Sequence, residues 1–324
     1  MGVIKLPKES IDFFADNYGE IFQSGELAEG KWNARVADSV CSYTTAKHAI
    51  AVNSNGAGLL TLLSLYKRYR AKKKIILQSN TMYGVRTVAN TSGLEICGYI
   101  DCALDYLMPT LEQVRAFIDR LEKPEEYVFL LTHIGGWLNP DIKSIASLCR
   151  DNGIALIEDC AHSLGALLDG NHAGLFGDAG VYSLYATKAI PVGEGGIVVT
   201  SDSELHEMLT KFVMYDRFDQ LLDVGTNFRM SEISALLTYS VIKETEEIIR
   251  DKLKIADEYV NACEQYGWEY LAPSADGQRS NLYKFILLSR ADNPEKEFAK
   301  ITKRTSPVYD YMLGNDPFSI KRRH

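Results

Sequence analysis

The sequence predicts an α/β fold in which a mostly parallel sheet is covered by helices on both faces, with a smaller C-terminal α/β domain. Short apolar segments alternate with helical stretches over most of the 324 residues, which is typical of parallel strands joined by helices. Apolar residues make up 46% and charged residues 24%, as in ordinary globular proteins. This length allows two domains, so we expect a large domain over residues 1–235 and a small one over 236–324.

The predicted elements follow one another from residue 49 onward. Apolar runs predict strands at residues 49–52, 74–78, 95–100, 127–131 and 154–158. Helical spacing predicts helices near residues 57–70, 83–92, 109–121 and 142–151. Gly153 stands just past the last of these helices, at a position where glycine commonly ends a helix.

From residue 159 the chain changes to short strands with many glycines, between Gly165 and Gly196. Glycine permits tight turns and a close approach of the backbone to a ligand. A strand at 197–200 then precedes a helix near 204–214. From Ser231 to Tyr266, apolar residues at helical spacing predict one long helix that leads into the small domain.

Composition and short motifs exclude several classes of partner. The net charge is −8 and no basic stripe is present, so we expect no nucleic acid partner. The apolar runs are far shorter than the roughly 20 residues that a transmembrane helix needs, and no signal segment is visible, so we expect a cytoplasmic protein without a membrane partner. The cysteines form no CxxC pair and the histidines no HExxH motif, so we expect no metal site.

Asp159 and Lys188 are the strongest candidates for chemistry. Asp159 ends a buried strand in IEDCAHSLGA, and open α/β sheets bind ligands at the carboxyl ends of their strands. Lys188 follows another apolar strand in GDAGVYSLYATK, close to several glycines. A pyridoxal phosphate enzyme needs a lysine that forms a Schiff base and a carboxylate that keeps the pyridine nitrogen protonated. Each residue alone has an ordinary explanation, a loop cap for the aspartate and a solvated side chain for the lysine.

Four motifs then resemble, in order and spacing, those of the DegT/StrS family of pyridoxal-phosphate-dependent sugar aminotransferases, which have the fold of type I aspartate aminotransferases. They are IEDCAHSLGA, GDAGVYSLYATK, GEGGIVVTSD and GTNFRMSEISA. With weaker matches upstream, the resemblance runs from about residue 20 to residue 260. It implies that Lys188 is the Schiff-base lysine, that Asp159 is the partner of the pyridine nitrogen, and that His162 lies near the ring hydroxyl of pyridoxal 5'-phosphate.

The resemblance also implies where the cofactor phosphate binds. Ser183 matches a serine that contacts the phosphate. The turn at residues 53–58 lies between a strand and a helix, where the N–H groups of Asn55, Gly56 and Ala57 favour an anion. The family's usual Gly-Thr pair falls on Asn55-Gly56 or on Gly56-Ala57, so the threonine hydroxyl is missing.

Three further positions carry expectations from the resemblance. Asn227 matches an asparagine that reaches the phosphate of the neighbouring subunit's cofactor, which implies a homodimer; an Asx turn is its ordinary alternative. Tyr83 or Met82 matches the aromatic residue that stacks on the cofactor, and Tyr83 is preferred. His133 matches a loop histidine that shapes the floor of the pocket.

The function that the resemblance implies is the transfer of an amino group from L-glutamate or L-glutamine to a keto group of a nucleotide-linked sugar. A sugar dehydratase of the same family is disfavoured, because such members replace the lysine that is present here as Lys188. A non-catalytic homologue that binds cofactor or sugar nucleotide as a regulatory module is the third reading. The altered turn supports it, as does a C-terminus shorter than is common in the family, which also leaves open the substrate contacts usually made there.

Overall fold

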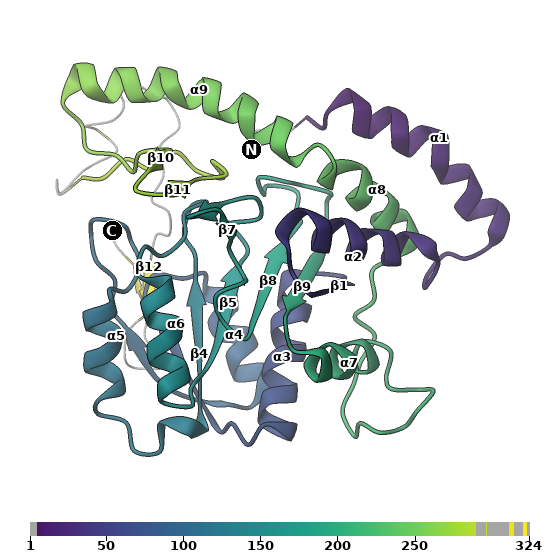
Figure 1. Cartoon of the computed structure of the whole chain (residues 1–324), viewed down its shortest axis with the longest axis horizontal. Helices are drawn as coiled ribbons and strands as arrows, with labels where there is room; N and C mark the ends of the chain where they lie inside the picture. Colours follow the sequence, from purple (N-terminus) through teal and green to yellow (C-terminus); the bar gives the residue numbers. More distant parts are fainter. Residues whose placement is uncertain (1–4, 290–295, 297–310, 314–319, 323–324) are drawn as a thin grey trace.

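A seven-stranded sheet forms the centre of the computed structural model, which describes residues 5–289, 296, 311–313 and 320–322 (Figure 1). Its strand order is β1-β9-β8-β5-β4-β2-β3. The strands are β1 (His48–Val52), β2 (Lys74–Gln78), β3 (Glu95–Ile100), β4 (Tyr127–Thr132), β5 (Ala155–Cys160), β8 (Ala179–Ser183) and β9 (Gly196–Thr200). Strand β9 runs antiparallel to both of its neighbours, and all other adjacent pairs are parallel. The predicted mostly parallel sheet is confirmed.

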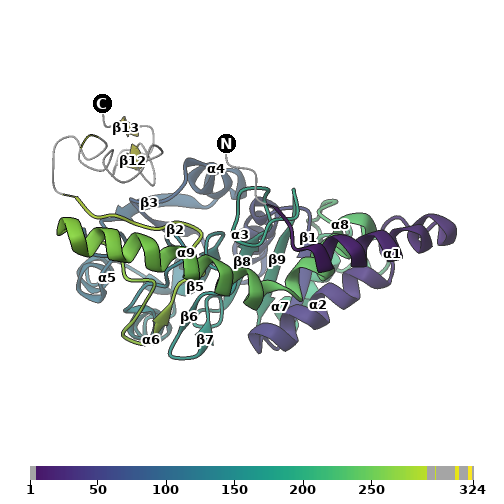
Figure 2. The same ribbon diagram turned by 90° about the horizontal axis from the view of Figure 1, so that it is seen from above.

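Helices cover both faces of this sheet, each over its own apolar core (Figure 2). One face carries α3 (Asn55–Tyr69), α4 (Tyr83–Ser92) and α7 (Ser203–Phe212). The other face carries α1 (Lys8–Ser24), α2 (Lys31–Thr44), α5 (Leu111–Ile118), α6 (Ile142–Asp151) and α8 (Glu232–Ile242). A short 3-10 turn, Pro124–Glu126, precedes β4. Strands β4 and β5 are buried over their whole length, because a sheet covered on both faces leaves no strand face in water.

One predicted element is wrong. Residues 231–266 form two helices, α8 and α9 (Thr245–Tyr266), and not one. The backbone leaves helical geometry at Glu244, where φ is −96° and ψ is 7°. The break has a packing reason. Helix α8 lies against α1 and α2 with Val241 and Ile242 buried in the core. Helix α9 runs on above β10 (Ser274–Ala275) and β11 (Gln278–Arg279) (Figure 1). Helices α1 and α2 lie in a part of the sequence for which no element was predicted.

The segment after α9 pairs with the segment that follows Asp159 in the sequence. Strands β6 (Leu167–Leu168), β7 (Asn171–His172), β10 (Ser274–Ala275) and β11 (Gln278–Arg279) form a four-stranded sheet in the order β10-β11-β6-β7. Strands β12 (Tyr311–Leu313) and β13 (Ile320–Arg322) pair with each other. The predicted boundary at residue 236 lies within α8, and most of residues 290–324 lie outside the described part, so the division into two domains stays a prediction. Among the described helices, none is long and apolar enough to span a bilayer.

Candidate active site

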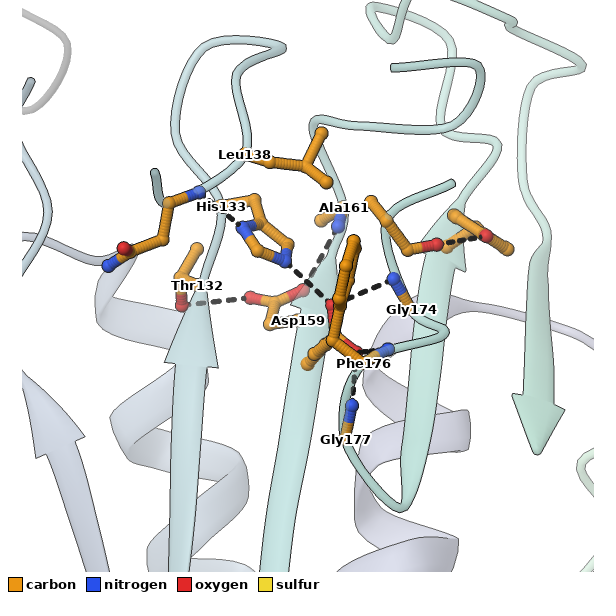
Figure 3. Close-up of polar contacts among 12 residues, drawn as sticks. Thr132, His133, Leu138, Asp159, Ala161, Gly174, Phe176 and Gly177 are labelled. Carbon is orange, nitrogen blue, oxygen red and sulfur yellow. Dashed lines mark hydrogen bonds and ion pairs between the residues drawn. The ribbon is translucent and has the colours of Figure 1, made fainter. Parts of the chain in front are cut away.

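The carboxyl ends of the parallel strands bring the predicted residues to one edge of the sheet. Asp159 lies near the end of β5 and Thr132 ends the neighbouring β4 (Figure 3). Ser183 ends β8, which pairs with the other side of β5. Lys188 follows five residues after Ser183. Ligands of open α/β sheets bind at this edge, so the structure places these side chains where the sequence predicted a site.

Asp159 is a buried carboxylate, 2% exposed, with three hydrogen-bond donors. Its Oδ1 accepts from Asn55 Nδ2 and from the N–H of Ala161, each at 3.1 Å, and its Oδ2 accepts from Thr132 Oγ1 at 3.3 Å. Burial raises the pKa of Asp159, while these donors and the nearby charge of Lys188 oppose the rise. Within the described part of the chain, Asp159 forms no ion pair at contact distance. Asp159 is thus a buried carboxyl group with which a cationic group of a ligand could pair.

Lys188 lies in the loop after β8 with its amine over an aromatic ring. Its Nζ is 4.9 Å from the centroid of the Tyr283 ring. Burial is the main cause that lowers the pKa of Lys188, and the neighbouring Tyr283 and Asp159 partly counteract it. A lower pKa leaves more of the amine neutral near pH 7, and only the neutral amine attacks a carbonyl carbon.

His162 is a neutral hydrogen-bond donor in this arrangement. Its ring is buried, and Nδ1 accepts a hydrogen bond from the N–H of Gly135 at 3.2 Å, so the proton of the neutral ring is on Nε2. Burial, followed by the charges of Lys188 and Lys284, holds the pKa of His162 well below its usual range. The ring lies 4.5 Å from that of Tyr283, centroid to centroid.

The turn at the start of α3 has the geometry of an anion site. Ser54 caps the helix, because its Oγ accepts from the N–H of Ala57 at 3.1 Å. Within the described residues, the N–H groups of Asn55 and Gly56 form no hydrogen bond, as expected for the first turn of a helix. Ser183 pairs with Gly196, and a Cβ on Gly196 would lie 2.5 Å from the carbonyl carbon of Ser54. The glycine is thus required for Ser183 and the turn to lie close together.

The structure places the two remaining predicted contacts at the surface. Asn227 is exposed, and its segment lies beside the turn of its own chain, since the N–H of Asn53 donates to the carbonyl of Phe228 at 2.8 Å. Met82 and Tyr83 are both exposed at the start of α4. The choice between them as the stacking residue stays a prediction, as does the contact of Asn227 with a second subunit.

Glu158, the neighbour of Asp159 in β5, is fully buried and accepts several hydrogen bonds. Its four donors, each within 2.8 Å, are His133 Nε2 and the N–H groups of Gly174, Phe176 and Gly177. The other ring nitrogen of His133 accepts from the N–H of Asn139 at 3.1 Å. Glu158, His133 and Cys160 lie close enough to resemble a metal site, but the carboxylate and the imidazole already use their donors and acceptors. Glu158 and His133 thus order the loops around Asp159. That His133 shapes the floor of the pocket stays a prediction.

Three contacts of the site were not foreseen. The side chain of Asn55 and the hydroxyl of Thr132 bind Asp159, whereas only the backbone of Asn55 had been assigned a role. Tyr283 reaches Lys188 and His162 because Asn281 Nδ2 donates to the carbonyl of His162 at 2.9 Å. Thr132 could have been identified from the sequence, because its hydroxyl stands at the end of an apolar strand. Tyr283 could not, because no sequence motif includes it.

Comparison with known proteins agrees with this geometry. The sequence profile of the DegT/DnrJ/EryC1/StrS aminotransferase family matches residues 9–307. A UDP-4-amino-4,6-dideoxy-N-acetyl-beta-L-altrosamine transaminase of Helicobacter pylori is 28% identical over 257 residues, covering 74% of this chain. The match spans 64% of the length of that relative.

Solved structures share the fold. The Helicobacter pylori aminotransferase PseC, involved in the biosynthesis of pseudoaminic acid, has a TM-score of 0.77 at 24% identity, over 92% of this chain and 78% of its own. A DegT DnrJ EryC1 StrS aminotransferase from Brucella abortus has a TM-score of 0.77 at 22% identity, over 90% and 78%. Together with the profile match over most of the sequence, these findings show that the chain belongs to the DegT/DnrJ/EryC1/StrS aminotransferase family.

Proposed function

We propose that this chain is a pyridoxal-phosphate-dependent aminotransferase that moves an amino group from L-glutamate or L-glutamine to a keto group of a nucleotide-linked sugar. The observation that carries the proposal is the buried carboxylate of Asp159, which has three donors and no contact ion pair in the described chain, near the amine of Lys188. The name of the Helicobacter pylori relative, a transaminase of a UDP-linked amino sugar, supports the substrate class.

The residues present fit pyridoxal phosphate at both ends. Asp159 would bind the ring nitrogen through Oδ2, and His162 would donate from Nε2 to the ring hydroxyl. Ser183 and the start of α3 would bind the phosphate, because the helix dipole and the N–H groups of its first turn favour an anion. When bound, the cofactor supplies an aldehyde that condenses with amines and a ring that accepts an electron pair.

Lys188 has two tasks in this proposal. Its neutral amine attaches the cofactor, which requires the lowered pKa that burial causes. Its second task would be proton transfer: as a free amine, Lys188 Nζ would take the proton from the donor carbon and pass it to the cofactor. Asp159 would supply the carboxylate that pairs with positive charge on the ring. The same residues would serve the reverse sequence on the keto sugar.

The test of this function is a half-reaction in protein loaded with pyridoxal phosphate. We expect L-glutamate or L-glutamine to change the cofactor absorbance and to release one equivalent of the matching 2-oxo acid, while the D enantiomers do neither. A panel of keto sugar nucleotides should then restore the starting spectrum. Bound cofactor without a spectral change would favour the regulatory homologue, and loss of water from the sugar without amino transfer would favour a dehydratase.

Asn227 is proposed to complete the site of a partner subunit. Its exposed side chain supports this, and so do the exposed apolar side chains Ile11, Tyr18 and Phe22 on α1, which suit a subunit contact. We expect a dimer by light scattering. Mixing Lys188→Ala chains with Asn227→Ala chains at limiting cofactor should restore activity, because each mixed dimer then contains one intact site, about a quarter of all sites. A fully active monomer, or no recovery on mixing, would contradict this arrangement.

A further inference from the structure

Asn55 is the first residue of α3, and its amide points beneath the turn into the sheet. Nδ2 donates to Asp159 Oδ1 at 3.1 Å and to the carbonyl oxygen of Val181 in β8 at 2.9 Å. Both amide protons are therefore in use. The side chain joins the start of the phosphate turn to the end of β5 and the middle of β8, so one residue connects the two ends of the proposed cofactor site.

The donors of Asp159 are divided unequally between its two oxygens. Among the described residues, Oδ1 accepts from Asn55 and from the N–H of Ala161, whereas Oδ2 accepts only from the hydroxyl of Thr132. Figure 3 shows the contacts of Ala161 and Thr132 with this carboxyl group. Thr81 Oγ1 lies 2.8 Å from Thr132 Oγ1. Because the single hydroxyl proton of Thr132 goes to Asp159, Thr81 must be the donor in that pair. Oδ2 can thus accept a further hydrogen bond, whereas both acceptor positions of Oδ1 are occupied.

We propose that the side chain of Asn55 is a positioning residue that keeps the Asp159 carboxylate ionised and turned so that Oδ2 is open to the ring nitrogen of the cofactor. The inference rests on the proposed function. A glycine here, one of the two placements of the family's Gly-Thr pair, could not make this contact. Asn55, which stands at this position of the Gly-Thr motif, therefore adds a contact to Asp159, at the end of the site opposite the phosphate.

The effect of Asn55 on the pKa of Asp159 can be measured separately from the effects of Lys188 and of burial. The amide stabilises the ionised form by a hydrogen bond, whereas Lys188 does so by its charge, and burial opposes both. Removing one donor from a buried carboxylate should therefore raise its pKa by about one unit. Placing a second carboxylate at the same distance should raise it further, since two like charges in contact cannot both ionise readily.

The experiment titrates Asp159 in the cofactor-free protein. Aspartate carboxyl carbons are labelled with ¹³C, and the Asp159 signal is assigned by its loss in Asp159→Asn. We expect the pKa of Asp159 to rise by about one unit in Asn55→Ala and by more in Asn55→Asp. Ser54→Ala is the matched control, because it removes the helix cap from the same turn but no donor of Asp159, and it should leave the pKa unchanged. An unchanged pKa in a folded Asn55→Ala protein would overturn the inference.

A second readout follows the ring itself. With pyridoxal phosphate labelled with ¹⁵N in the ring, we expect the nitrogen signal of the Asn55 variants to move toward that of the unprotonated ring, and that of Ser54→Ala to stay. A ring signal unmoved in both Asn55 variants would also count against the inference. If the protein takes up no cofactor, the proposed function fails, but the carboxyl titration still decides the role of Asn55.

Discussion

Replacing Lys188 with alanine is expected to remove every covalent bond between the protein and pyridoxal phosphate. After borohydride reduction, peptide mapping of the wild type should find the label on Lys188, and the Lys188→Ala protein should carry none. The amino transfer should fall by at least about a thousandfold, because both the attachment and the proton transfer depend on this amine. Non-covalent cofactor held by the phosphate turn should remain detectable by absorbance.

Lys252 provides the matched control for this experiment. Burial lowers its pKa to about 8, and its Nζ donates to the carbonyl of Ala189 at 3.0 Å, one residue beyond Lys188. It is therefore a second lysine with a lowered pKa, which lies in α9 and contacts the loop of Lys188. Lys252→Ala should keep the label on Lys188. A label on Lys252, or no label in wild-type protein saturated with cofactor, would refute the assignment of Lys188.

Replacing Asp159 with alanine should abolish the donor half-reaction while much of the cofactor stays bound. Removing the partner of a buried cation costs roughly 3–5 kcal/mol, so the ring nitrogen should lose its proton. Each step of about 1.4 kcal/mol on a barrier is tenfold in rate, so we expect a loss of two to three orders of magnitude or more. Ser183, the α3 turn and Lys188 should still hold the cofactor.

Single-turnover kinetics with L-glutamate measure this loss. The conservative substitution Asp159→Glu is measured beside it. It keeps the carboxylate but moves it by one methylene, so its rate should lie between those of Asp159→Ala and the wild type. A rate of Asp159→Ala within about tenfold of the wild type would show that Asp159 does not bind the ring nitrogen.

Features that depend on neighbouring residues in the sequence could be predicted, whereas those that depend on tertiary contacts could not. Asp159 lies at a strand end, and alternating apolar and helical segments are enough to locate such an end. Ser183, in contrast, is identified by the resemblance to the family. The break between α8 and α9 could not be predicted, because the helical pattern continues through it and only the packing of α8 on α1 and α2 requires the turn. The contact of Asn55 with Asp159 spans 104 residues and depends on which way an amide points, which no spacing encodes.

Glu158 and Asp159 are adjacent, yet one organises the surrounding loops and the other faces the proposed chemistry. Successive residues of a strand point to opposite faces, so the register of β5 alone decides which carboxylate enters the site. A slip of one residue would exchange them, with the longer side chain in the site and the shorter one facing donors it cannot reach. Substitutions in β4 or β8 that loosen the pairing of β5 should therefore abolish the proposed activity, although every site residue named above is unchanged.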